Sequence, residues 1–193
     1  MSRLQAINPK EATGRAKELL DEVYSKLGMT PNLVRVLANS PDVLQAYLSF
    51  SDALSNGLLS ARLREQIALT VAQANRSSYC LAAHTAIGKT VGLSKENILD
   101  SRQGMSPDSK VHETLQFVRQ MVEKRGWVHD MDVWRLRKRG YGDAEISEIV
   151  ANVAFNIFTN YFNQVAATEV DFPKVAESDS RREQSRNRRK TNS

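Results

Sequence analysis

The stretch REQIALTVAQANRSSYCLAAHTAIGKTVG, residues 64–92, contains the only cysteine of the chain. Its first half carries apolar residues at the three- and four-residue intervals of an amphipathic helix. Small polar residues then interrupt this pattern, and Ser77 and its neighbours are good caps for a second helix that should run to about Val91. The stretch therefore predicts two consecutive helices, with Cys80 in the first turn of the second one.

Similar patterns extend over the rest of the chain. Serine precedes proline at two expected helix starts, Ser40 and Ser106, and glycine follows several apolar-periodic segments, where helices commonly end. No segment shows a sustained alternation of apolar and polar residues with the turns that hairpins require. We therefore predict an all-α fold of roughly eight helices and no sheet.

Length and charge suggest one domain followed by a basic tail. The 193 residues are enough for a single domain with a sizeable core. Residues 178–193 carry six Arg or Lys and two acidic residues, so they account for +4 of the net charge of +5 and leave +1 for residues 1–177. We expect residues 1–177 to form one all-helical domain and residues 178–193 to be disordered. The tail has no aromatic side chain that could stack on bases, so nucleic acid is not an expected partner.

The sequence also favours a cytoplasmic protein that forms homo-oligomers. No apolar run reaches the roughly 18 residues that a membrane-spanning helix requires, and the first twenty residues lack the apolar core of a secretory signal. A single cysteine cannot form an intramolecular disulfide, which fits a reducing compartment. Residues 146–162 are apolar on more than one helical face, and such a helix is either central in its own chain or part of a subunit interface.

Cys80 and His84 are four residues apart and should lie on the same face of one helix. The positive end of the helix dipole favours the thiolate form of a cysteine in the first turn, and a neighbouring imidazole could take the thiol proton. The same residues also suit a buried cysteine that acts as a small apolar side chain beside an unrelated histidine. Glu65 is either a third member of this site or a solvent-facing residue beside Arg62 and Arg64.

The segment REQIALTVAQANRSSYCLAAHTAIGKTVGLS resembles the core motif of the alkylhydroperoxidase D / carboxymuconolactone decarboxylase family, a glutamate, eleven residues and then Cys-x-x-Cys-x-x-x-His. The segments TPNLVRVLANSPDVLQAYLSFSDAL and NIFTNYFNQVAATEVDFP are similar to the peroxidase-related branch, so the resemblance extends over residues 30–173. It implies an all-α fold that assembles into oligomers and no metal or organic cofactor. The remaining histidines, His112 and His129, form no metal-ligand spacing with Cys80.

The resemblance also implies roles for individual residues. Cys80 matches the family's peroxide-attacking cysteine, and Glu65 and His84 match the glutamate and histidine of its proton relay. Ser77 stands where the family has its first cysteine, which resolves the sulfenic acid as a disulfide. Because a serine hydroxyl cannot form a disulfide, an external thiol or dithiol would have to resolve an oxidised Cys80.

These residues support one leading interpretation and two alternatives. The leading one is a thiol-dependent peroxidase that reduces hydrogen peroxide or an organic hydroperoxide through Cys80. Its expected partners are the small hydroperoxide, an external thiol reductant and further copies of the chain. The first alternative is a decarboxylase-like enzyme that uses His84 or Glu65 in acid–base chemistry on a lactone carboxylate. The second is a noncatalytic oligomeric binding protein, and Ser77 in place of a cysteine is its best support.

Overall fold

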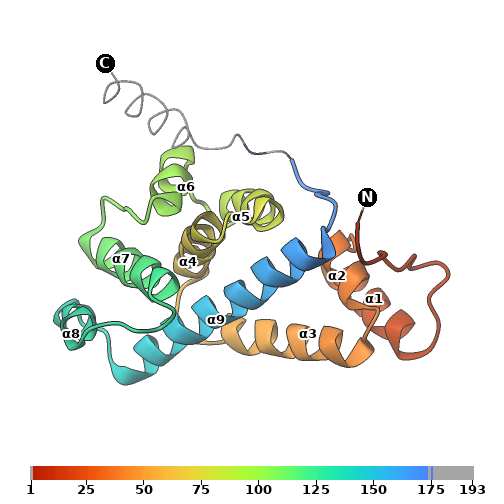
Figure 1. The fold of residues 1–193 in the computed structure, drawn as a ribbon, viewed down its shortest axis with the longest axis horizontal. Helices are drawn as coiled ribbons and strands as arrows, with labels where there is room; N and C mark the ends of the chain where they lie inside the picture. Colours follow the sequence, from red (N-terminus) through yellow and green to blue (C-terminus); the bar gives the residue numbers. More distant parts are fainter. Residues whose placement is uncertain (1, 174, 176–193) are drawn as a thin grey trace, which may run out of the picture.

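The computed structural model describes residues 2–173 and residue 175, and within them it contains nine α-helices and no strand (Figure 1). The predicted all-α class is confirmed, and the expected number of roughly eight helices is close. The predicted domain boundary at residue 177 and the predicted tail, residues 178–193, lie outside the described residues. The helices are α1 (Gly14–Leu27), α2 (Asn32–Leu37), α3 (Pro41–Ser55), α4 (Ala61–Ala74), α5 (Ser78–Thr90), α6 (Lys95–Arg102), α7 (Ser109–Glu123), α8 (Asp130–Lys138) and α9 (Asp143–Ala166).

The two helices predicted from residues 64–92 are α4 and α5. Ser60 caps α4, and its Oγ accepts a hydrogen bond from the Leu63 backbone N–H at 3.2 Å. After α4, Arg76 adopts the left-handed conformation with a φ of 55°, which turns the chain towards α5. Ser77 is the N-cap residue of α5, as the sequence predicted. This tight connection places the start of α5 beside the end of α4. Helix α4 as a whole contacts α5, α6, α7 and α9.

One of the two predicted Ser-Pro helix starts is confirmed. Ser40 is the N-cap residue of α3, whereas the start predicted at Ser106 is wrong. The N-cap residue of α7 is instead Asp108, whose carboxylate accepts hydrogen bonds from the backbone N–H groups of Lys110 and Val111 at 2.8 and 3.1 Å. A carboxylate is favoured here because its charge also interacts with the positive end of the helix dipole.

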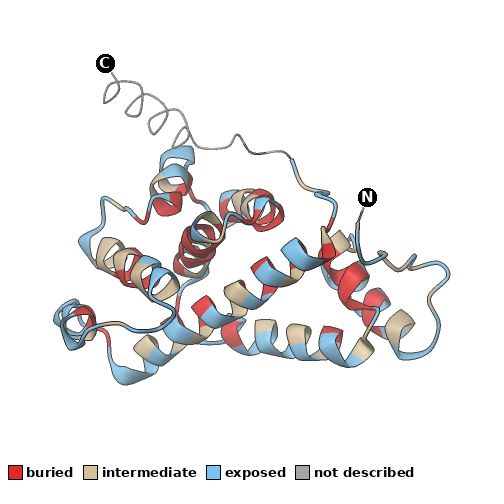
Figure 2. Ribbon diagram, in the orientation of Figure 1, coloured by how far each residue is buried: buried red, intermediate tan, exposed pale blue. Residues whose placement is uncertain are grey.

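Two groups of buried apolar residues hold the helices together, as the red segments of Figure 2 indicate. The first, which we name the Cys80 cluster, joins α1, α2 and α3 to the end of α4 and the start of α5. The second, which we name the α7 cluster, joins α4, α7, α8 and the first half of α9. The Cys80 cluster comprises Leu19, Leu20, Val23, Leu33, Val34, Leu37, Ala38, Leu44, Ala72, Tyr79, Cys80 and Ala83. The α7 cluster comprises Leu59, Leu63, Ile67, Val71, Leu115, Phe117, Val118, Leu136, Tyr141, Ile149 and Val153.

Helix α9 is 24 residues long and runs past both clusters (Figure 1). Ile149 and Val153 are fully buried in the α7 cluster, so part of the apolar surface that predicted a homo-oligomer is used inside the chain. Phe158, Tyr161 and Val165 are 40 %, 56 % and 64 % exposed, and homo-oligomerisation stays a prediction. Neither α9 nor any other helix among the described residues has the length and hydropathy needed to cross a bilayer.

Candidate active site

Cys80 is the third residue of α5 and is 2 % exposed. Its predicted place in the first turn of this helix is confirmed. The Sγ atom accepts a hydrogen bond from the side-chain Nδ2 of Asn163 at 3.3 Å. Asn163 lies near the end of α9, 83 residues further along the chain, and sequence reasoning did not identify it as a site residue. An N–H donor aimed at sulfur stabilises a thiolate more than a thiol, because the thiolate is the stronger acceptor.

Glu65 and His84 are in direct contact. The Glu65 Oε2 lies 2.8 Å from the His84 Nδ1, and the two side chains are 15 % and 19 % exposed. Glu65 is therefore not the fully solvent-facing residue that the sequence left as one possibility. Because a carboxylate can only accept, this contact assigns the proton to Nδ1 and leaves Nε2 as the atom able to take another proton. The pair can thus act as a base whose positive charge the carboxylate would stabilise.

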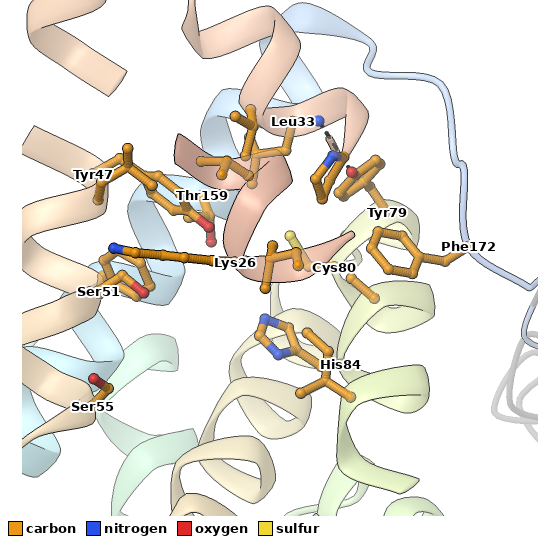
Figure 3. Close-up of a pocket in the computed structure, with 18 of the residues that line it drawn as sticks. Lys26, Leu33, Tyr47, Ser51, Ser55, Tyr79, Cys80, His84, Thr159 and Phe172 are labelled. Atoms are coloured by element: carbon orange, nitrogen blue, oxygen red, sulfur yellow. Dashed lines mark hydrogen bonds between the residues drawn. The ribbon is translucent and has the colours of Figure 1, made fainter. Parts of the chain in front are cut away.

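Cys80 and His84 lie on the same cavity, which has a volume of about 410 Å³ (Figure 3). The opposite walls come from α1, α2 and α3, and α9 and the segment after it complete them. Most of the walls are apolar or aromatic, so a molecule in the cavity would meet the thiol and the imidazole in a largely apolar setting. Representative wall residues are Leu27, Leu33, Tyr47, Tyr79, Phe155 and Phe172.

A buried phenol, Tyr79, and a partly buried one, Tyr47, line the cavity with Cys80. The hydroxyl oxygen of Tyr79 accepts a hydrogen bond from the Leu33 backbone N–H at 3.1 Å, and burial raises the pKa of this phenol. Burial also raises the pKa of Tyr47 to about 12, and negative charge on Cys80 and Glu65 adds to the effect. Both phenols are therefore neutral at physiological pH and serve as walls and hydrogen-bonding groups rather than as bases.

Ser77 is buried next to this site and is 1 % exposed. Although it is the N-cap residue of α5, its side chain accepts no capping hydrogen bond. Among the described residues, its Oγ atom has no hydrogen-bond partner, and the same holds for the Asn163 Oδ1. Buried polar atoms without partners are uncommon in folded proteins, so these two atoms mark a place where the structure is not optimised for stability alone.

The structure thus brings together residues from distant parts of the sequence. The predicted residues Cys80 and His84 line the cavity and Glu65 contacts His84, whereas Asn163 and Phe172 were not predicted. A signal for Asn163 does exist, since asparagines recur at three- and four-residue spacing along one face of the apolar helix α9, at positions 152, 156, 160 and 163. In the part of the chain that the structure describes, no group of three or more His, Cys, Asp or Glu side chains is arranged to hold a metal ion.

Residues 41–123 match the model of the Carboxymuconolactone decarboxylase family. These residues resemble a domain of this family. The matched region contains Glu65, Ser77, Cys80 and His84, so the resemblance first seen in the core motif is confirmed. Comparison with curated protein sequences finds no match.

Solved structures share the fold of this chain. An uncharacterized peroxidase-related protein from Silicibacter sp. TM1040 is 24% identical with a TM-score of 0.75, over 88% of this chain and 94% of that one. The alkylhydroperoxidase AhpD core of an uncharacterized peroxidase-related protein from Ralstonia eutropha JMP134 is 24% identical with a TM-score of 0.78, over 88% and 92%. The debrominase Bmp8 C82A in complex with 2,3,4-tribromopyrrole is 15% identical with a TM-score of 0.76, over 89% and 92%. At these identities the likeness shows the AhpD-like fold alone.

Proposed function

We propose that this protein is a thiol-dependent peroxidase that reduces hydrogen peroxide or an organic hydroperoxide through Cys80. The observation that carries the proposal is the Glu65–His84 contact at 2.8 Å, because it prepares an imidazole on the same cavity as the thiol. A nucleophile beside an oriented base is the arrangement that activates a cysteine. The description of two structural neighbours as peroxidase-related adds support.

The proposed reaction begins when His84 Nε2 takes the proton of the Cys80 thiol, while Glu65 stabilises the resulting imidazolium. The thiolate attacks one peroxide oxygen, so that a sulfur–oxygen bond forms and the oxygen–oxygen bond breaks. The departing hydroxide or alkoxide takes the proton back from His84 and leaves as water or an alcohol. Cys80 is left as a sulfenic acid, and the peroxide has been reduced by two electrons.

An external thiol completes the cycle, since Ser77 replaces the family's resolving cysteine. One thiol displaces water from the sulfenic acid and forms a mixed disulfide with Cys80. A second thiol attacks this disulfide, releases Cys80 and leaves as the oxidised reductant. A dithiol reductant would supply both thiols from one molecule.

The test is to treat the protein with one equivalent of hydrogen peroxide or cumene hydroperoxide and to trap sulfenic acid with dimedone. Intact mass should show one adduct in the parent and none in Cys80→Ser. Glu65→Gln should lower the rate of adduct formation about 100-fold, because it removes the negative partner of His84. Glu18→Gln is the matched control, since Glu18 is exposed on α1, and should react like the parent.

Other outcomes would favour the alternatives. A parent that neither consumes peroxide nor forms the dimedone adduct would refute the peroxidase proposal. If Cys80→Ser still converted a lactone carboxylate, the lactone chemistry with His84 or Glu65 would be favoured instead. Absence of both reactions would favour the noncatalytic binding protein, for which Ser77 remains the supporting observation.

A further inference from the structure

Asn163 is held firmly against the reactive sulfur. Its side chain is buried, with 4 % of the residue exposed, and its Nδ2 lies 3.3 Å from the Cys80 Sγ. The Asn163 backbone oxygen accepts a hydrogen bond from the Thr168 N–H at 3.1 Å, which ties the end of α9 to the residues that follow. The amide therefore has a fixed position from which it donates to sulfur.

The Ser77 Oγ and the Asn163 Oδ1 are among the six buried side-chain atoms that lack partners within the described residues. The Asn163 Oδ1 belongs to the same amide that contacts the thiol, so it lies close to the sulfur. Ser77 is the N-cap residue and Cys80 the third residue of α5, and these two positions lie on the same side of a helix start. Leaving such atoms unpaired is costly, which points to a partner that is present only in another state of the site.

Oxidation of Cys80 would supply such a partner. A sulfenic acid adds one hydroxyl to sulfur, and this hydroxyl both donates and accepts hydrogen bonds. The Ser77 hydroxyl can donate to its oxygen, and the Asn163 Oδ1 can accept its proton. Both groups that are unpaired around the thiol would then be paired around the oxidised cysteine.

We propose that Asn163 stabilises Cys80 as a thiolate, and that Asn163 and Ser77 together form a hydrogen-bonding pocket that stabilises it as a sulfenic acid. The thiolate role depends only on the geometry, whereas the sulfenic-acid role rests on the proposed peroxidase function. Ser77 then has a task of its own in a site without a second cysteine. It holds the oxidised intermediate until an external thiol arrives.

The thiolate role is tested by the rate of Cys80 alkylation with iodoacetamide between about pH 5 and about pH 10. Asn163→Leu should react about tenfold more slowly than the parent near neutral pH, because a hydrogen bond to the thiolate is lost. The difference should vanish at high pH, where the thiolate forms in both proteins. A merely structural role for Asn163 would not produce this pH-dependent difference.

Asn156→Leu is the matched control, because Asn156 is a buried asparagine of the same helix whose Nδ2 donates to the Asn152 backbone oxygen at 2.8 Å. It should follow the parent profile. Asn163→Asp keeps the shape of the side chain and adds negative charge beside sulfur, so it should slow alkylation at least as much and serves if Asn163→Leu does not fold. Superimposable profiles for the Asn163 variants and the parent would overturn the thiolate role.

The sulfenic-acid role is tested by the lifetime of the dimedone-reactive state in excess peroxide. Ser77→Ala should lose the sulfenic acid about fivefold faster than the parent, by onward oxidation to the sulfinic acid. Ser78→Ala is the matched control, since Ser78 is the next residue and is exposed. It should behave like the parent.

The two experiments separate the inference from the proposed function. A parent that forms no sulfenic acid would refute the peroxidase function together with the sulfenic-acid role, and the alkylation profiles would still decide the thiolate role. If the parent sulfenic acid forms and Ser77→Ala loses it at the same rate, the peroxidase function stands and the role of Ser77 is overturned.

Discussion

The α7 cluster and the surroundings of Cys80 share helices α4 and α9 but differ in how polar groups are treated. In the α7 cluster, Leu115, Val118 and Ile149 are completely buried, and the buried hydroxyl of Thr114 is paired with the Lys110 backbone oxygen at 3.0 Å. Around Cys80 there is a cavity of about 410 Å³. The buried side-chain atoms that lack partners among the described residues include none from α7 or α8.

This difference shows how one helical frame accommodates two requirements. Close-packed apolar side chains contribute most of the stability of a small domain, whereas a reactive site needs open space and polar groups with unused hydrogen-bonding capacity. Helix α9 changes from Ile149 and Val153 in its first half to Asn160 and Asn163 in its second half. We call the α7 cluster the well-packed end of the molecule and the surroundings of Cys80 the reactive end. The well-packed end therefore offsets the free energy that the open space and unpaired polar groups of the reactive end cost.

The largest expected effect is a loss of stability at the well-packed end. Leu115→Ala removes a side chain that is 0 % exposed and should lower the free energy of unfolding by about 3 kcal/mol. Urea unfolding followed by circular dichroism measures this change. Leu58→Ala is the control, since Leu58 is 65 % exposed and its truncation should cost well under ~1 kcal/mol. Equal stabilities for the two variants would mean that the α7 cluster is not the main source of stability.

A smaller effect is expected at a paired polar group beside the cavity. Tyr79→Phe removes the hydroxyl that accepts from the Leu33 backbone N–H and leaves this N–H buried without its partner, which should cost about 1–2 kcal/mol. Tyr161→Phe, at a position that is 56 % exposed, provides the matched comparison in the same urea experiment. If Tyr79→Phe is as stable as the parent, hydrogen bonds at the reactive end contribute less to the free energy of unfolding than their burial suggests.

The smallest effect is a pH dependence of stability at the reactive end. Burial raises the pKa of Tyr47 to about 12, so this phenol stays protonated in the folded protein after it would ionise in the unfolded chain near pH 10. Its contribution to stability is therefore fully present below about pH 10 and is lost as the pH rises to about 12. A two-unit difference in pKa corresponds to about 2.7 kcal/mol. Because Tyr47 is only partly buried and solvent screens part of this effect, we expect Tyr47→Phe to reduce the fall of the unfolding free energy over this range by about 1 kcal/mol.

Tyr141 in the α7 cluster is the comparison for this measurement. Burial raises its pKa as well, but the hydrogen bond with Thr114 acts in the opposite direction. We therefore expect Tyr141→Phe to change the alkaline fall in stability less than Tyr47→Phe does. The reverse order would place the pH-sensitive part of the molecule at the well-packed end.

Local patterns were enough to predict the class of the fold and the helix that carries Cys80. The start of α5 after Ser77 depends on residues that are neighbours in sequence, and such local preferences are visible in the chain itself. The start of α7 was misplaced because Ser106 and Asp108 are both good caps two residues apart, and only the packed structure selects one. When two neighbouring residues are both good N-caps, tertiary contacts decide at which one the helix starts.

The site was predictable only in part, because some of its contacts join residues that are far apart in the sequence. Cys80 and His84 share a helix, so their proximity follows from their spacing. The contact between Glu65 and His84 spans 19 residues and depends on how α4 packs against α5, which spacing does not determine. Asn163 reaches Cys80 across 83 residues, and the position of α9 relative to α5 fixes that contact.

The cavity walls have a consequence for how this protein could diversify during evolution. The family match, residues 41–123, contains the candidate site residues Glu65, Cys80 and His84, but Leu27, Phe155 and Phe172 line the cavity from outside it. Mutations in α1, in α9 or near the last described residues would therefore reshape the space for a substrate without touching the thiol or its base. Chains that conserve the matched region could in this way exchange one substrate for another while the chemistry at Cys80 persists.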